Sequence, residues 1–250
     1  MSRFCVNKPT SGAMSESRFE ETPAQPWGDR PPPQSDGPNE DRPAHEPLVN
    51  APWQAVAVTV LILGGYFIQR FFPADAVLGA YAFSPVNLTS TRWETAITAI
   101  FLHGSWAHAL MNAAFALAFS TPLARFFGAK LEGGLAFFAF YIACGILANL
   151  GYAAVHPHGM GLVVGASGAV SGLMGASARL IGGHGRVGPL FSSAVLSMGA
   201  AWIAINGLIA VFGGQILPGS GGAGVAWESH IAGFVAGALI IGLFSRFSPE

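Results

Sequence analysis

Charged side chains are scarce in the last two hundred residues, and this scarcity limits what the chain can fold into. Thirteen of the twenty-five Lys, Arg, Asp and Glu residues fall within the first fifty positions, which leaves twelve for all the rest. Hydrophobic residues make up 52% of the chain and charged residues 10%, whereas soluble domains carry about 25% charged residues. A long segment with so few charges is predicted to lie in a lipid bilayer.

The overall charge and the cysteines exclude several other classes of protein. The formal net charge is −1, and no basic stripe points to a nucleic-acid partner. The two cysteines, Cys5 and Cys144, lie in a polar segment and in an apolar one, so no disulfide is predicted between them. Two cysteines are also too few for a structural metal site built from cysteines.

The first fifty residues differ in composition from the remainder. Residues 1–50 contain nine prolines, mixed charges and few aliphatic side chains. Such a segment buries too little apolar surface to offset the entropy lost on ordering, so we predict a disordered, Pro-rich cytoplasmic tail. A docking site for a partner is the alternative interpretation of this tail. Residues 51–250 are predicted to form a single membrane domain.

Six apolar stretches in this domain predict an all-α protein with six transmembrane helices. They cover about residues 53–72, 94–124, 133–154, 167–179, 189–212 and 227–247. Most Lys and Arg residues lie in the tail or in links on one side of this arrangement, so both termini are predicted to be cytoplasmic. The link at 73–92 is expected to lie in the membrane boundary. The Gly-rich link at 213–224 is expected to act as a movable cap on the outer side.

Histidine and serine residues, which can act in catalysis, occur near the starts of alternate predicted helices. His103 and His108 lie toward the start of the second predicted span, Ser167 at the start of the fourth and His230 at the start of the sixth. When the N-terminus is cytoplasmic, even-numbered helices all begin on the outer side. These side chains are therefore predicted to meet in one leaflet. Two simpler interpretations remain: a serine that only permits helix packing, and a histidine that bonds a main-chain carbonyl.

Glycine spacing brings the fourth and sixth spans together. Two pairs of glycines have the small-xxx-small spacing that lets helix backbones approach closely: Gly168 with Gly172, and Gly233 with Gly237. Such an approach would bring the Ser167 hydroxyl within reach of His230, which could then take the hydroxyl proton. Glu228 projects to nearly the opposite face of the helix from His230. We therefore expect a Ser–His dyad without a third member.

The second span supplies two further polar side chains on one face. His108 and Asn112 are four residues apart, and as a pair without an acid or a cysteine they make a poor set of metal ligands. They are better suited to stabilising an oxyanion, together with the backbone N–H of Ser167 at its helix start. His103 points away from them and is expected to have a structural role in the adjacent loop.

In this order, these motifs resemble those of rhomboid intramembrane serine proteases. The matching pieces are His103-x4-His108-x3-Asn112, Gly165-Ala-Ser167-Gly168 and His230-x2-Gly233-x3-Gly237, on the second, fourth and sixth spans. The resemblance covers about residues 53–247. It implies a nucleophile at Ser167, a general base at His230 and oxyanion donors at His108 and Asn112. The site is expected to be supported by His103 and by five glycines: Gly165, Gly168, Gly172, Gly233 and Gly237.

The resemblance also implies an activity: cleavage of transmembrane substrates near the membrane boundary, without cofactor or metal. A six-span member would sit in a bacterial cytoplasmic membrane. Three positions depart from the family pattern. Ser171 stands where an aromatic residue often packs on the base, Arg92-Trp93 replaces a Trp-Arg pair, and Glu228 lies beside the base. The alternative function is a non-catalytic rhomboid-like protein that binds and routes membrane clients. A proton-relay transporter has no intramembrane acid or inverted repeat to support it.

Overall fold

The computed structural model of the chain describes residues 51–216 and 224–248. Within these ranges the secondary structure is helical, apart from one isolated antiparallel bridge between Phe83 and Val163. The all-α prediction is therefore confirmed. The predicted tail at 1–50 lies outside the described residues, and so does most of the predicted cap, at 217–223.

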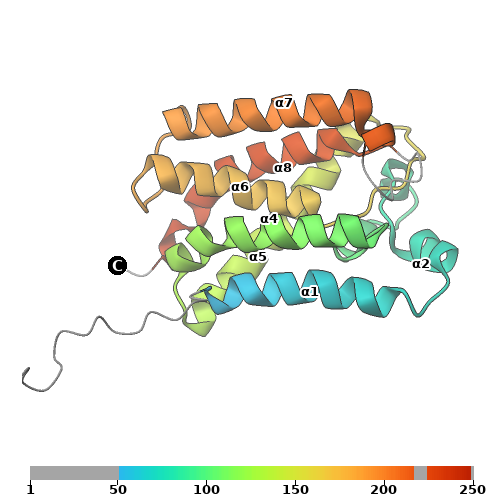
Figure 1. Ribbon diagram of the computed structural model, residues 1–250, viewed down its shortest axis with the longest axis horizontal. Helices are drawn as coiled ribbons and strands as arrows, with labels where there is room; N and C mark the ends of the chain where they lie inside the picture. The colour runs from blue at the N-terminus through green and yellow to red at the C-terminus, as the bar shows by residue number, and fades with distance from the viewer. Residues whose placement is uncertain (1–50, 217–223, 249–250) are drawn as a thin grey trace, which may run out of the picture. The chain divides into compact units, whose positions relative to one another are not determined.

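Eight α-helices and three short 3₁₀ segments follow one another in the described residues (Figure 1). They are α1 (Trp53–Gln69), α2 (Ala74–Tyr81), η1 (Pro85–Leu88), α3 (Thr95–Thr98), η2 (Ala99–Phe101), α4 (Trp106–Phe127), α5 (Leu131–Val155), α6 (Ser167–Gly182), α7 (Ser193–Ile216), α8 (Trp227–Ile240) and η3 (Ile241–Phe247).

Four of the described helical segments are long and apolar enough to cross a membrane. They are Trp106–Phe127, Leu131–Val155, Ser193–Phe212 and Trp227–Phe247, the last of which combines α8 with η3. Helix α1 is apolar but has only 17 residues, and α6 has 16. Among the described residues, length and composition therefore make four of the six predicted spans candidates for crossing a membrane, and α1 and α6 are shorter than these four.

The second predicted span begins later than expected. The sequence predicts a helix from about Glu94, but α4 begins at Trp106, after two short helical turns and an extended Leu102. The hydroxyl of Ser105 accepts a hydrogen bond from the backbone N–H of His108, 3.2 Å away, and so caps the new helix. His103 consequently lies in the loop before α4.

Helix α6 occupies the centre of the bundle. It packs against α4, α5, α7 and α8, and Figure 1 shows it running alongside α4 and α7. Every residue from Gly168 to Ala178 is buried. Many of these residues are Gly, Ala or Ser, and their small side chains let neighbouring helices pack close to the α6 backbone.

The closest approach of two helices joins α6 to α8. A Cβ atom added to Gly233 would overlap the carbonyl oxygen of Gly168, and one added to Gly237 would overlap that of Gly172. Only glycine fits at these two positions of α8. The contact brings the first turn of α6 against the first turn of α8, where Ser167 and His230 lie.

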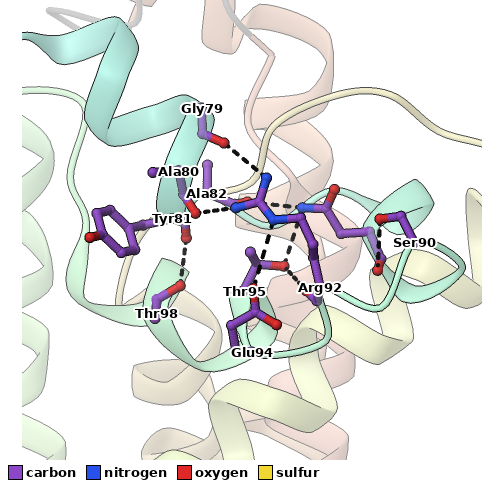
Figure 2. A network of polar contacts seen from close by, with 10 residues as sticks. Gly79, Ala80, Tyr81, Ala82, Ser90, Arg92, Glu94, Thr95 and Thr98 are labelled. Carbon is purple, nitrogen blue, oxygen red and sulfur yellow. Dashed lines mark hydrogen bonds and ion pairs between the residues drawn. The ribbon is translucent and has the colours of Figure 1, made fainter.

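The link between α1 and α4 is folded and held by polar contacts (Figure 2). The Arg92 guanidinium donates hydrogen bonds to the carbonyl oxygens of Gly79, at 3.1 Å, and Ala80, in the last turn of α2. Thr98 Oγ1 donates to the carbonyl of Tyr81 at 2.7 Å. A cation is favourable at the C-terminal end of a helix. The predicted boundary link thus contains a short helix that Arg92 ties to the segment leading into α4.

Large apolar side chains remain exposed on the outside of the bundle. Helix α7 is the clearest case, since Leu196, Ile203, Leu208 and Val211 are all more than half exposed. Its inner stripe, with Val195, packs against α6 and α8. Apolar surface of this extent matches a lipid environment. The chain is an integral membrane protein.

Candidate active site

A cavity of about 280 Å³ lies where α4, α6 and α8 begin. Its walls combine the polar residues predicted from the sequence with apolar side chains from the segment before α6, from α7 and from the segment before α8. The lining includes Gly104, Ser105, His108, Met111, Asn112, Leu162, Val163, Val164, Gly165, Ser167, Ile209, Val225, Ala226, Ser229 and His230.

Ser167 and His230 meet in this cavity. Ser167 Oγ lies 2.8 Å from Nε2 of His230. Ser167 is the first residue of α6 and is half-buried, whereas His230 lies in the first turn of α8 and is buried. A hydroxyl and an imidazole at this distance can exchange a proton.

The other ring nitrogen of His230 is bonded to α7. Its Nδ1 lies 2.7 Å from Oδ1 of Asn206, a fully buried residue. Asn206 is not among the residues predicted from the sequence. A signal was present, however: Asn206 is an amide inside an otherwise apolar stretch, and polar groups within a span are expensive unless they serve a function.

The two predicted oxyanion donors, His108 and Asn112, line the same cavity from α4. Asn112 is buried, and its Nδ2 has no hydrogen-bond partner among the described residues. A Cβ on Gly165 would lie 2.7 Å from Nε2 of His108. Gly165 has φ of 124°, which favours glycine. The backbone therefore passes close to His108 and Asn112 just before Ser167, and this places the three side chains around one space.

His103 is held by the end of α1. The Gln69 side chain accepts a hydrogen bond from the backbone N–H of His103 at 3.0 Å and donates one to its carbonyl at 2.9 Å. Burial, followed by the neighbouring His108, lowers the pKa of His103 to about 3. The ring is therefore neutral. Its edge faces His108, with 5.2 Å between ring centroids.

Ser171 stands where rhomboid proteases often have an aromatic residue that packs on the catalytic base, and its side chain bonds within its own helix instead. Its hydroxyl donates to the carbonyl oxygen of Ser167, 2.7 Å away in the same helix. An aromatic ring instead comes from α7: the Trp202 ring lies 5.9 Å from the His230 ring, centroid to centroid, at an angle of 36°. A tryptophan from a different helix thus fills the space beside the imidazole.

Glu228 has a partner away from His230. Its Oε1 lies 2.9 Å from Nε2 of His156, the residue directly after α5. The His156 ring also packs on Tyr152, with 4.6 Å between ring centroids. Glu228 therefore links the start of α8 to the end of α5.

Metal ligands do not cluster in the part of the chain that the structure describes. No group of three or more His, Cys, Asp or Glu side chains is placed to hold an ion there. The cavity instead gathers a hydroxyl, two imidazoles and an amide, which are groups suited to nucleophilic acyl transfer.

Comparison with known protein families gives a match for this chain. The family model described as "Rhomboid domain" matches residues 90–247, a range that contains α4 to α8 and every residue of the cavity. A search of curated proteins found no match.

Proposed function

Since the chain belongs to the rhomboid family, we propose that it is an intramembrane serine endopeptidase. Its substrates would be transmembrane segments of other membrane proteins, cut near the outer membrane boundary. The observation that carries this proposal is the 2.8 Å contact between Ser167 Oγ and His230 Nε2 inside a cavity.

In the proposed reaction, Ser167 attacks the scissile carbonyl carbon while His230 Nε2 takes the hydroxyl proton. The carbonyl oxygen then carries the negative charge of a tetrahedral intermediate. Asn112 Nδ2, which has no partner among the described residues, can donate to that oxygen. The His108 ring and the backbone N–H of Ser167, at the positive end of α6, would add to this stabilisation.

The second half of the reaction returns the enzyme to its starting state. His230 gives its proton to the leaving amine, and the peptide C–N bond breaks to leave an ester on Ser167. A water molecule then attacks the ester carbonyl while His230 takes its proton. The Ser167–carbonyl bond breaks, and Ser167 recovers the proton from His230. No cofactor or metal ion enters this sequence of steps.

The proposed topology places this cavity toward the outer side of the membrane. We propose that α1 and α6 cross the bilayer together with the four longer segments, with both chain ends in the cytoplasm. The placement of basic residues supports this orientation, because Arg125, Lys130, Arg179 and Arg246 all lie toward the end of the bundle opposite to the cavity.

The proposal is tested by incubating the purified protein in detergent with a labelled transmembrane substrate. We expect cleavage by the wild type and none by Ser167→Ala or His230→Ala. Ser177→Ala is the matched control, since this serine lies in the same helix but is buried and donates to the Phe119 carbonyl, 3.0 Å away. Undiminished cleavage by either site variant would contradict the dyad. Failure of the wild type to cleave several substrates would favour a protein that binds membrane clients.

A further inference from the structure

Asn206 makes two hydrogen bonds that together fix its orientation. Its Nδ2 donates to the carbonyl oxygen of Trp202, 2.9 Å away, and its Oδ1 lies 2.7 Å from Nδ1 of His230. A carbonyl oxygen can only accept. The NH₂ group of Asn206 must therefore face Trp202, and its oxygen must face the imidazole.

This orientation determines where the proton of His230 resides. An amide oxygen also only accepts, so Nδ1 of His230 has to carry a proton in order to bond Asn206. In a neutral imidazole, Nε2 is then left with its lone pair exposed. That lone pair faces Ser167 Oγ at 2.8 Å, which is the arrangement a general base requires.

Trp202, which lies on α7 like Asn206, also supports the His230 imidazole. The Trp202 ring packs beside His230 at 5.9 Å, one helical turn before Asn206. The nucleophile and the base lie on α6 and α8, whereas both groups that hold the base lie on α7. The inner stripe of α7 thus has a role at the site beyond packing.

We propose that Asn206 is a third member of the catalytic constellation, a positioning residue that holds His230 in the tautomer able to accept the Ser167 proton. This inference rests on the proposed function. It replaces the expected dyad with a Ser–His–Asn arrangement whose third member comes from α7. Asparagine fills the corresponding position in Cys–His–Asn proteases.

Two substitutions of Asn206 distinguish the effect of its hydrogen-bond acceptor from the effect of its side-chain volume. Asn206→Leu keeps a similar volume and removes the acceptor, whereas Asn206→Asp keeps an oxygen in the same place. The matched control is Asn149→Leu, which removes the buried side-chain amide of another residue. Asn149 lies on α5, and its amide donates to the Ala96 carbonyl, 2.9 Å away. All three variants are made in the full chain.

Kinetics give the first readout. For Asn206→Leu we expect kcat for a transmembrane substrate to fall by about 10-fold to 100-fold, less than the loss of a general base, with KM within about twofold. Asn206→Asp should recover most of kcat, within about fivefold of the wild type. Asn149→Leu should retain the wild-type kcat in the folded fraction.

Nitrogen NMR on protein labelled at histidine gives a readout that a merely structural role would not move. The chain has seven histidines, so the His230 signals are identified by their loss in His230→Ala. We expect the wild type to show His230 protonated at Nδ1, and Asn206→Leu to lose this preference. Because the wild type alone reports the tautomer, this readout does not depend on the folding of any Asn206 variant.

The outcomes distinguish this inference from the proposed function. A wild-type His230 protonated at Nε2 would overturn the role of Asn206, and so would a wild-type kcat in Asn206→Leu. The dyad itself is tested separately, by loss of cleavage in Ser167→Ala and in His230→Ala. Cleavage that survives in Ser167→Ala would overturn the proposed function itself, whatever the tautomer of His230.

Discussion

Ser167 Oγ and His230 Nε2 lie 2.8 Å apart although 63 positions separate the two residues in the chain. Neither helix could achieve this alone, because serine has a short side chain and helix axes normally stay about 8–10 Å apart. The contact depends on glycines where α6 meets α8. Each prediction below concerns a group that either makes this contact possible or acts beside it.

Asn112 is predicted to stabilise the transition state. Its buried Nδ2 has no partner among the described residues and lines the same cavity as Ser167. We expect Asn112→Ala to lower kcat by about 10²-fold, as the loss of one oxyanion donor does elsewhere, with little change in KM. Steady-state kinetics with a transmembrane substrate provide the check. An equal loss through KM alone would place Asn112 in substrate binding instead.

Gly237 is predicted to be essential for the close packing of α6 and α8. A methyl group there would overlap the Gly172 carbonyl oxygen, and forcing such a group into a packed interface costs about 1–3 kcal/mol. Gly237→Ala should therefore lower the midpoint of thermal unfolding in detergent and reduce cleavage.

Gly64→Ala is the control for this substitution. Gly64 lies in α1, and apart from its two chain neighbours and the adjacent backbone of its own helix no atom lies within 4 Å of the position that a Cβ would occupy. Alanine is favoured over glycine inside a helix by roughly 0.5–1 kcal/mol, so this variant should be as stable as the wild type or slightly more so. A Gly237→Ala protein as stable as Gly64→Ala would contradict the packing argument.

Glu228 is predicted to be dispensable for catalysis. Its carboxylate pairs with His156 at 2.9 Å, and the His156 side chain is 39% exposed. Glu228→Gln keeps an oxygen that can accept a hydrogen bond from His156, so it should change stability only slightly and leave cleavage near the wild-type rate. A double-mutant cycle with His156→Ala measures the coupling. If Glu228→Gln lost as much activity as His230→Ala, Glu228 would act on the base after all.

Arg92 is predicted to hold the short helix α2 in place. Its guanidinium donates to the carbonyls of Gly79 and Ala80 (Figure 2). In Arg92→Gln we expect faster backbone hydrogen exchange across residues 79–82, because that turn loses two of its hydrogen bonds to the rest of the link. Arg70→Gln, at an exposed position that ends α1, is the matched control. Equal hydrogen exchange at residues 79–82 in the two variants would contradict this role of Arg92.

The sequence predicts much of this architecture because charge and glycine act locally. The scarcity of charge after residue 50 indicates helices in a membrane, and the glycine spacing around Gly168 and Gly233 indicates which two helices meet. The start of α4 is missed, because apolar composition continues through residues 94–105 while the Ser105 cap decides where the helix begins. Hydropathy is insensitive to a single capping hydroxyl.

The contacts of His230 with α7 could not be predicted from residue spacing within one helix. Asn206 and Trp202 reach the imidazole from α7, and their contact depends on how α7 turns its inner stripe toward α8. Nothing in a single helix reports that rotation. The same reasoning applies to Glu228, whose partner His156 lies 72 positions away at the end of another helix.

The central claim is that Ser167 is a nucleophile activated by His230. The most direct test treats the purified protein with a fluorophosphonate probe, which labels only activated serines, and locates the labelled residue by mass spectrometry. We expect the probe on Ser167 in the wild type and no labelling of Ser167 in His230→Ala. Labelling of a different serine in the wild type, or equal labelling of Ser167 in both proteins, would contradict the claim.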